Sequence, residues 1–236
     1  MPTLESIKLA LTVVSGVCWT IVYIEGIRIG FRDKSYAIPF YALALNFAWE
    51  SLYTWFGFRT DGITAQNIFN AVWFMFDIGI LYTYFKFGRK YFRVNFRNSA
   101  AYADGIFVAW SLLFLVTAFA AEYAFLKEFG IGKGAGYSAF LQNLLMSILF
   151  IAMLAQRGSR EGQSLLIGIN KWIGTLAPTI LYGLIGEGGF PQGSFLILVL
   201  GSLCSVFDLI YISMLRGTPS KTNQARPGRK AGFTSS

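Results

Sequence analysis

Long apolar stretches of the sequence are interrupted by four carboxylic acids: Glu25, Glu50, Asp77 and Asp208. A charged group at the centre of a bilayer costs on the order of 2.5–3.5 kcal/mol even on the mildest scales, so acids in such stretches indicate a function. Because desolvation disfavours the ionised form, a buried carboxyl group keeps its proton and can donate it. The sequence contains no histidine, so proton transfer in an apolar core would depend on these acids. The same absence excludes histidine-ligated metal sites and Ser-His-Asp triads.

Glu50 stands among polar and aromatic residues at helical spacing. Residues three and four positions apart share one helix face, which places Asn46, Phe47 and Tyr53 beside this acid. The setting suits a proton donor. The alternative is a hydrogen bond that ties two helices together, for instance to Lys171, the one basic residue deep within an apolar run. We favour the functional interpretation.

Asp208 and Asp77 have comparable surroundings. Asp208 shares a helix face with Tyr211, and Asp77 follows Trp73 by one helical turn. For each of these acids, taken alone, a functional role and an internal hydrogen bond are equally compatible with the pattern. Lys171 could also serve as the counter-ion to any of the buried acids.

Glu25 differs from the other three acids because it lies three residues before Arg28, near the end of an apolar run. This spacing predicts an ion pair on the helix surface, which stabilises a helix by about 0.2–0.5 kcal/mol. We therefore expect Glu25 to have a structural role.

The sequence is rich in aromatic residues, with 23 Phe, 12 Tyr and 6 Trp. Aromatic faces stabilise a nearby cation by about 0.5–2 kcal/mol each, so a cavity that combines acids with aromatic walls would suit carbocation chemistry. The same rings would also suit an ordinary helix-bundle core, and for any single ring we favour the core. The candidates within apolar runs are Phe47, Trp49, Tyr53, Trp73, Trp110 and Tyr182.

The composition indicates the elements that must position these residues. Hydrophobic residues make up 55% of the 236-residue chain and charged residues 14%, whereas a soluble domain has roughly 25% charged residues. A membrane-spanning helix needs about 20 apolar residues. Seven such runs predict an all-α polytopic membrane protein with a seven-transmembrane helix bundle over residues 1–217. The runs cover residues 4–27, 37–57, 66–87, 103–125, 135–155, 163–185 and 193–215.

The distribution of basic residues predicts the orientation of this bundle. Fifteen Lys and Arg residues lie in the first, third and fifth connectors and the tail, against four on the opposite side. By the positive-inside rule the N-terminus is lumenal or external and the C-terminus cytoplasmic. We explain the net charge of +8 by this topology and by contact with anionic cytoplasmic lipid, in preference to nucleic-acid binding by the basic third connector. The polar segment 218–236 reads as a disordered cytoplasmic tail.

Several segments carry a resemblance to a known family. Residues 16–23, 33–39 and 46–50 resemble the small integral-membrane terpene cyclases of fungal meroterpenoid and indole-diterpene pathways, which also have bacterial relatives. The Asn-x-x-Trp-Glu pattern ending at Glu50 is the most specific part. An Asn-x-x-Trp-Phe-x-x-Asp pattern ending at Asp77 and the late Asp208-x-x-Tyr211 extend the similarity over nearly the whole chain.

The resemblance implies an enzyme that protonates the terminal epoxide or alkene of a prenyl chain on an aromatic or indole core. It assigns the protonation to Glu50 and Asp208. The substrate would be lipophilic and would come from an upstream prenyltransferase or epoxidase. The substrate-binding residues that we expect are Asn46, Phe47, Trp49, Tyr53, Trp73, Asp77 and Tyr211.

Neither a metal ion nor another cofactor is expected. The sequence contains no Asp-Asp-x-x-Asp and no Asp-x-Asp-Asp motif, so it resembles neither the metal-dependent diphosphate-ionising cyclases nor the soluble protonation-initiated ones. The main alternative is a proton-coupled small-molecule transporter, since intramembrane acids serve that function as well. A retinal photoreceptor is disfavoured because the last run contains no lysine. The membrane would be the endoplasmic reticulum in a fungus or the plasma membrane in a bacterium.

Overall fold

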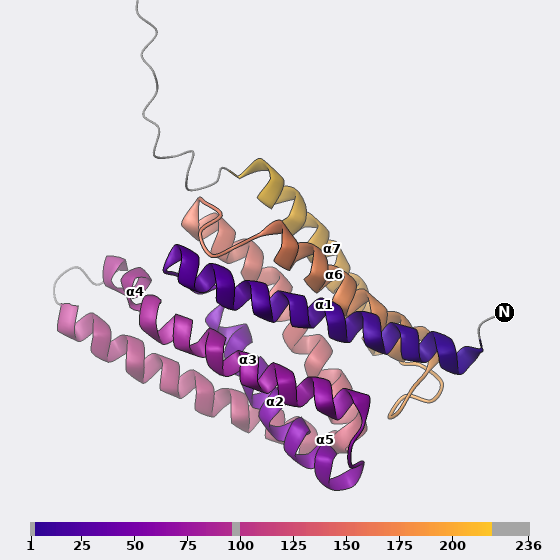
Figure 1. Cartoon of the computed structure of the whole chain (residues 1–236). Coiled ribbons are helices and arrows are strands. Elements are labelled where there is room, and N and C mark those ends of the chain that lie inside the picture. Colours follow the sequence, from indigo (N-terminus) through magenta and orange to yellow (C-terminus); the bar gives the residue numbers. More distant parts are fainter. Residues whose placement is uncertain (1–2, 96–99, 219–236) are drawn as a thin grey trace, which may run out of the picture.

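A computed structural model describes residues 3–95 and 100–218 of the chain, and their regular structure is helical apart from one isolated bridge between Glu187 and Phe190. The prediction of an all-α protein is therefore confirmed. Figure 1 shows the helices gathered side by side into one bundle. They are α1 (Leu4–Asp33), α2 (Phe40–Thr60), α3 (Ala65–Phe87), α4 (Arg89–Asn95), α5 (Ala100–Arg157), α6 (Leu165–Ile180), the π-helix η1 (Leu181–Ile185) and α7 (Phe195–Gly217).

Hydroxyl side chains mark where four of the helices begin. Thr3, Thr64, Ser164 and Ser194 each precede a helix and accept a hydrogen bond from the backbone N–H three residues further on. Such caps satisfy one of the free N–H groups of the first turn and contribute about 1 kcal/mol each. The boundaries of α1, α3, α6 and α7 are thus set locally by short polar residues next to apolar runs.

The segmentation in the middle of the chain differs from the prediction. The expected runs 103–125 and 135–155 both fall within α5, on either side of a kink at Gly130, where the backbone is not helical (φ 73°, ψ 177°). A Cβ atom on Gly134 would lie 2.7 Å from the carbonyl oxygen of Phe125, whereas nine residues of straight helix span about 13.5 Å. The chain therefore doubles back at Gly130, and in Figure 1 the two halves of α5 leave the bend in different directions.

Five helical segments of the described residues are long and apolar enough to cross a membrane: Leu4–Asp33, Ala65–Val94, Ala101–Arg157, Leu165–Ile185 and Phe195–Gly217. By this criterion the predicted count of seven is not met. The two runs joined in α5 count once. Helix α2 occupies the predicted run 37–57, but its polar residues, among them Asn46 and Glu50, lower its hydropathy. The predicted tail lies outside the described residues from position 219 onward.

Small residues allow the helices around the site to pack closely. A Cβ atom on Gly16 of α1 would lie 2.5 Å from the Phe69 ring of α3, and one on Gly174 of α6 would lie 2.9 Å from the Trp19 ring of α1. Glycine at such positions lets helices approach each other as they do in membrane bundles. Outward positions carry apolar side chains such as Val116, 68% exposed, which suits contact with lipid.

Candidate functional site

A cavity of about 420 Å³ lies within the bundle. Its walls come from α1, α2, α3, the second half of α5, Pro178, η1 and the loop that precedes α7. The lining reaches exposed connectors at Asp61 and Gly188, so the cavity extends to one end of the bundle. Five of the sequence-predicted site residues line it: Asn46, Trp49, Glu50, Tyr53 and Trp73.

Glu50 is held in a buried hydrogen-bond network. The Tyr23 hydroxyl donates to Glu50 Oε1 at 3.3 Å, and Asn46 Nδ2 donates to the Tyr23 oxygen at 2.5 Å and to Asp77 Oδ2 at 3.0 Å. Among the described residues, Glu50 Oε2 has no hydrogen-bond partner. Asp77 is fully buried behind Asn46 and does not line the cavity. Of these two buried acids, Glu50 therefore faces the cavity, and Asp77 belongs to its support.

An aromatic wall flanks Glu50. The Tyr23 ring stacks against Trp73 with a centroid distance of 6.1 Å, and Trp19 adjoins Tyr23 at 6.3 Å. The Trp73 indole N–H donates to Thr20 Oγ1 at 3.2 Å, which fixes the orientation of its ring. Sequence reasoning did not single out Trp19 or Tyr23 as site residues. Their four-residue spacing on one helix face was the available signal.

On the other side of Glu50, Trp49 and Tyr53 connect α2 to the second half of α5. The Trp49 indole N–H donates to the carbonyl oxygen of Ala135 at 3.0 Å, and the rings of Trp49 and Tyr53 lie 5.2 Å apart. Both rings line the cavity. The cavity thus combines a buried carboxyl group with aromatic faces from α1, α2 and α3, among others.

Asp208 lies elsewhere in the bundle. Lys171 Nζ contacts its two carboxylate oxygens at 2.8 and 3.0 Å and also donates to Ser147 Oγ at 2.7 Å. The exposed fractions of the Lys171 and Asp208 side chains are 0% and 1%. Neither residue lines the cavity, so the structure does not bring Asp208 and Glu50 together. Lys171 is the counter-ion of Asp208, and the alternative of a bond from Lys171 to Glu50 is not observed.

Two further expected binding residues also lie away from the cavity lining. Tyr211 donates to Gln163 Oε1 at 3.0 Å, and Phe47 stacks on Phe74 with a centroid distance of 5.3 Å. Both are packing residues of the bundle.

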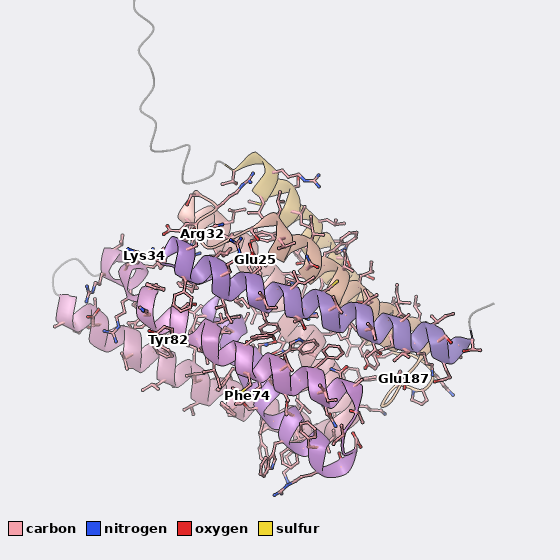
Figure 2. The ribbon with its side chains drawn as sticks, viewed as in Figure 1. Glu25, Arg32, Lys34, Phe74, Tyr82 and Glu187 are labelled. Atoms are coloured by element: carbon pink, nitrogen blue, oxygen red, sulfur yellow. The ribbon has the colours of Figure 1, made fainter. Side chains whose placement is uncertain are left out.

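The expected ion pair of Glu25 is confirmed, with Arg28 donating to its oxygens at 2.6 and 2.8 Å. Figure 2 shows Glu25 on α1, toward the end that also carries Arg32.

Glu122 is a buried acid that sequence reasoning missed. It lies inside the predicted run 103–125 and is 2% exposed. The argument applied to Glu50, that an acid in an apolar run indicates a function, would have found it. Its Oε2 atom has no hydrogen-bond partner within the described part of the chain.

The mouth of the cavity is bordered by a glycine-rich loop. Gly188 and Gly189 line the cavity, and a Cβ atom on Gly189 would lie 2.8 Å from the backbone of Gly132 at the bend of α5. Glu187 forms an ion pair with Lys8 of α1, with 2.8 Å between nitrogen and oxygen. Figure 2 shows Glu187 near the N-terminal end of α1. The loop is thus tied to both α1 and α5.

Fold and site together define a helical membrane protein whose bundle encloses an aromatic-walled cavity with a buried acid. The chain belongs to the Pyr4-like transmembrane terpene cyclases, whose family model matches residues 2–216. It is thus an enzyme, a terpene cyclase of secondary-metabolite biosynthesis, and an integral membrane protein. Family membership decides against the alternative of a transporter.

Curated relatives agree with the family model. The chain is 34% identical over 174 residues to the Pyr4-family terpene cyclase mfmH of Annulohypoxylon moriforme, covering 73% of this chain and 68% of that protein. It is 29% identical to the terpene cyclase macJ of Penicillium terrestre, covering 89% and 81% of the two chains. The terpene cyclase pyr4 of Aspergillus fumigatus is 24% identical, with 85% and 82% covered. No solved structure matches the chain.

Proposed function

We propose that Glu50 is the general acid that starts the cyclisation, by protonating the terminal epoxide or alkene of a prenylated aromatic substrate. The observation that carries this proposal is the carboxyl oxygen of Glu50 that lacks a hydrogen-bond partner. Glu50 faces the cavity, its Oε1 is occupied by Tyr23, and its Oε2 has no partner within the described residues. A proton on Oε2 would therefore be available to a substrate in the cavity.

The network behind Glu50 supports this role. Asp77 is connected to Glu50 through Asn46 and Tyr23, and two neighbouring buried carboxyl groups disfavour simultaneous ionisation. Glu50 is thus supported as a neutral acid before the reaction. Once the proton has left, the Tyr23 hydroxyl donates to the resulting carboxylate, which stabilises the negative charge.

The aromatic wall suits the next stage of the reaction. Trp19, Trp49 and Trp73 line the same cavity as Glu50. Their ring faces would stabilise the positive charge as it moves along the folded prenyl chain. Exclusion of water by the bundle would protect the cation from premature capture.

We assign Asp208 a supporting role in place of the direct protonation implied by the resemblance. It is fully engaged by Lys171 and does not line the cavity. With Ser147 of α5, Lys171 of α6 and Asp208 of α7, the cluster ties three helices together. Asp208 would act on catalysis by fixing the helices that shape the cavity.

The proposed topology has seven crossings, with a lumenal N-terminus and a cytoplasmic C-terminus. The reversal at Gly130 supports separate crossings by residues 100–129 and 131–157 of α5. The position of α2 between α3 and α5 supports a crossing by α2 despite its polar residues. The excess of basic residues at one end supports the orientation. In a fungal host the membrane would be the endoplasmic reticulum, and in a bacterium the plasma membrane.

Membranes that contain the protein test the function directly. The probes are a phenol that carries a farnesyl chain and the terminal epoxide of the same compound, since the proposed substrates come from a prenyltransferase or an epoxidase. We expect conversion of a probe to a cyclic isomer of unchanged mass, and a rate lowered by about 10²–10⁴-fold in Glu50→Gln.

Glu128→Gln is the matched control, because Glu128 is exposed on α5. Wild-type cyclisation rates in Glu50→Gln would refute the general-acid role. Conversion of neither probe by wild-type membranes would contradict the proposed substrate class.

A further inference from the structure

Three buried polar groups meet beside the cavity wall without satisfying one another. They are the Tyr53 hydroxyl of α2, the Ser138 hydroxyl of the second half of α5, and the Glu122 carboxyl of its first half. Ser138 lies next to both of the other groups. Tyr53 Oη, Ser138 Oγ and Glu122 Oε2 have no hydrogen-bond partner among the described residues. This cluster is separate from the Glu50 network.

The bend of α5 creates the cluster. Glu122 and Ser138 lie on opposite sides of Gly130, and only the reversal of the chain brings them together. A Cβ atom on Gly134 would lie 2.9 Å from Tyr53 Oη. A glycine at this position therefore leaves room for the phenol to reach the gap between the two halves of the helix.

The two proton-handling groups lie close together on α2 but face different neighbours. Glu50 and Tyr53 are three residues apart and both line the cavity. The Glu50 carboxyl contacts Tyr23 of α1, whereas the Tyr53 hydroxyl faces Ser138 and Glu122 of α5. One side of α2 thus carries the proposed proton donor, Glu50. The other side leads to Glu122, a second carboxyl group that has no part in the proposed donation.

We propose that Tyr53, Ser138 and Glu122 form the proton exit that ends the cyclisation. This inference rests on the proposed function of Glu50. A C–H bond beside the final cationic carbon breaks, and its electron pair forms the C=C bond that cancels the charge. The proton passes to Tyr53 Oη while the Tyr53 proton passes to Ser138 and the Ser138 proton to the Glu122 carboxylate. Glu50 has then supplied one proton and Glu122 has accepted one, so the net reaction is an isomerisation.

The distribution of products tests this exit. In Glu122→Gln, which keeps the size and hydrogen-bonding capacity of the side chain, we expect the probe to be consumed at nearly the wild-type rate. The share of the native alkene product should fall by at least about tenfold, which is less than the roughly 10²–10⁴-fold that a general base contributes to a rate. Isomeric alkenes and hydrates, formed when water captures the cation, should take its place.

The control is again Glu128→Gln, which makes the same substitution at an exposed position of α5. An unchanged product ratio in Glu122→Gln would overturn the proposal. If that variant accumulates poorly, Tyr53→Phe and Ser138→Ala test the same relay, and native product ratios in both would also overturn it. The two proposals can fail separately. If Glu50 is not the general acid, Glu50→Gln will consume the probe at the wild-type rate. If Glu122 is not the end of the proton exit, Glu122→Gln will give the wild-type products.

Discussion

Tyr23 of α1 donates its phenolic proton to Glu50 of α2 at 3.3 Å while accepting a hydrogen bond from Asn46 at 2.5 Å. The other oxygen of the Glu50 carboxyl group has no hydrogen-bond partner among the described residues. The Asn46 amide also donates to Asp77, so Tyr23 and Asn46 together connect the two carboxyl groups. The Glu50 carboxyl group is thus oriented by a neighbouring helix.

The first prediction concerns this hydrogen bond. Tyr23→Phe removes the donor to the developing carboxylate and keeps the ring that packs on Trp73. Loss of one donor to a developing anion lowers kcat by about 10²-fold. We expect a decrease approaching that size with little change in KM, measured by the rate of probe cyclisation in membranes.

Tyr82→Phe is the control for Tyr23→Phe, because Tyr82 is exposed on α3, where Figure 2 labels it. A kcat for Tyr23→Phe equal to that of the control would mean that Tyr23 does not stabilise the carboxylate.

The second prediction separates a structural role of Asp208 from a catalytic one. Lys171→Met leaves a buried carboxylate unpaired, which destabilises a protein by about 3–5 kcal/mol. We expect the amount of folded protein recovered from membranes to fall sharply. The double variant Lys171→Met/Asp208→Leu replaces the pair with apolar side chains and should restore both the protein level and the cyclase rate. A stable double variant without activity would instead place Asp208 in the chemistry.

The third prediction concerns the bend in α5. Gly130 adopts a backbone conformation (φ 73°, ψ 177°) that side chains other than glycine's strongly disfavour, with a strain of about 1–3 kcal/mol. Gly130→Ala should lower the temperature at which detergent-solubilised protein loses its monodisperse elution peak. Gly105→Ala on the same helix is the control, because a Cβ atom there meets nothing within 4 Å. Loss of the elution peak at the same temperature in both variants would argue against strain at Gly130.

The fourth prediction distinguishes the two possible starting groups. Protonation of an alkene places the proton on carbon, where it stays, whereas protonation of an epoxide places it on oxygen, where it exchanges. In D2O we therefore expect the product of the farnesyl phenol to carry one deuterium on carbon and the product of its epoxide to carry none. Mass spectrometry after back-exchange in H2O gives the answer. An unlabelled product from the alkene would contradict protonation by an exchangeable acid such as Glu50.

Much of the fold could be predicted because it depends on local patterns. The run 66–87 differs from α3 (Ala65–Phe87) by one residue, since a threonine cap and apolar composition define that helix. The runs 103–125 and 135–155 were predicted as separate helices, and the non-helical backbone at Gly130 does divide α5 into two helical halves. The polar face of α2 was correctly placed in a helix by its spacing.

The site was less predictable, because helical spacing does not reveal which face of a helix points at which neighbour. Glu50 was found since its immediate neighbours Asn46 and Tyr53 share its face. For Asp208 the same reasoning left a functional role and an internal hydrogen bond equally compatible, because its partner Lys171 lies 37 residues away in sequence. Glu122 meets Ser138 only through the reversal at Gly130, a tertiary relationship that no local pattern predicts.

The ion pair between Lys8 and Glu187 has a consequence for how the enzyme is assayed. It ties α1 to the loop that borders the cavity mouth, and the Glu187 side chain is 41% exposed. Salt screens such exposed charges, since the Debye length falls from about 10 Å at 0.1 M to about 3 Å at 1 M. Entry and departure of substrate should therefore respond to ionic strength, while proton transfer from the buried Glu50 should not.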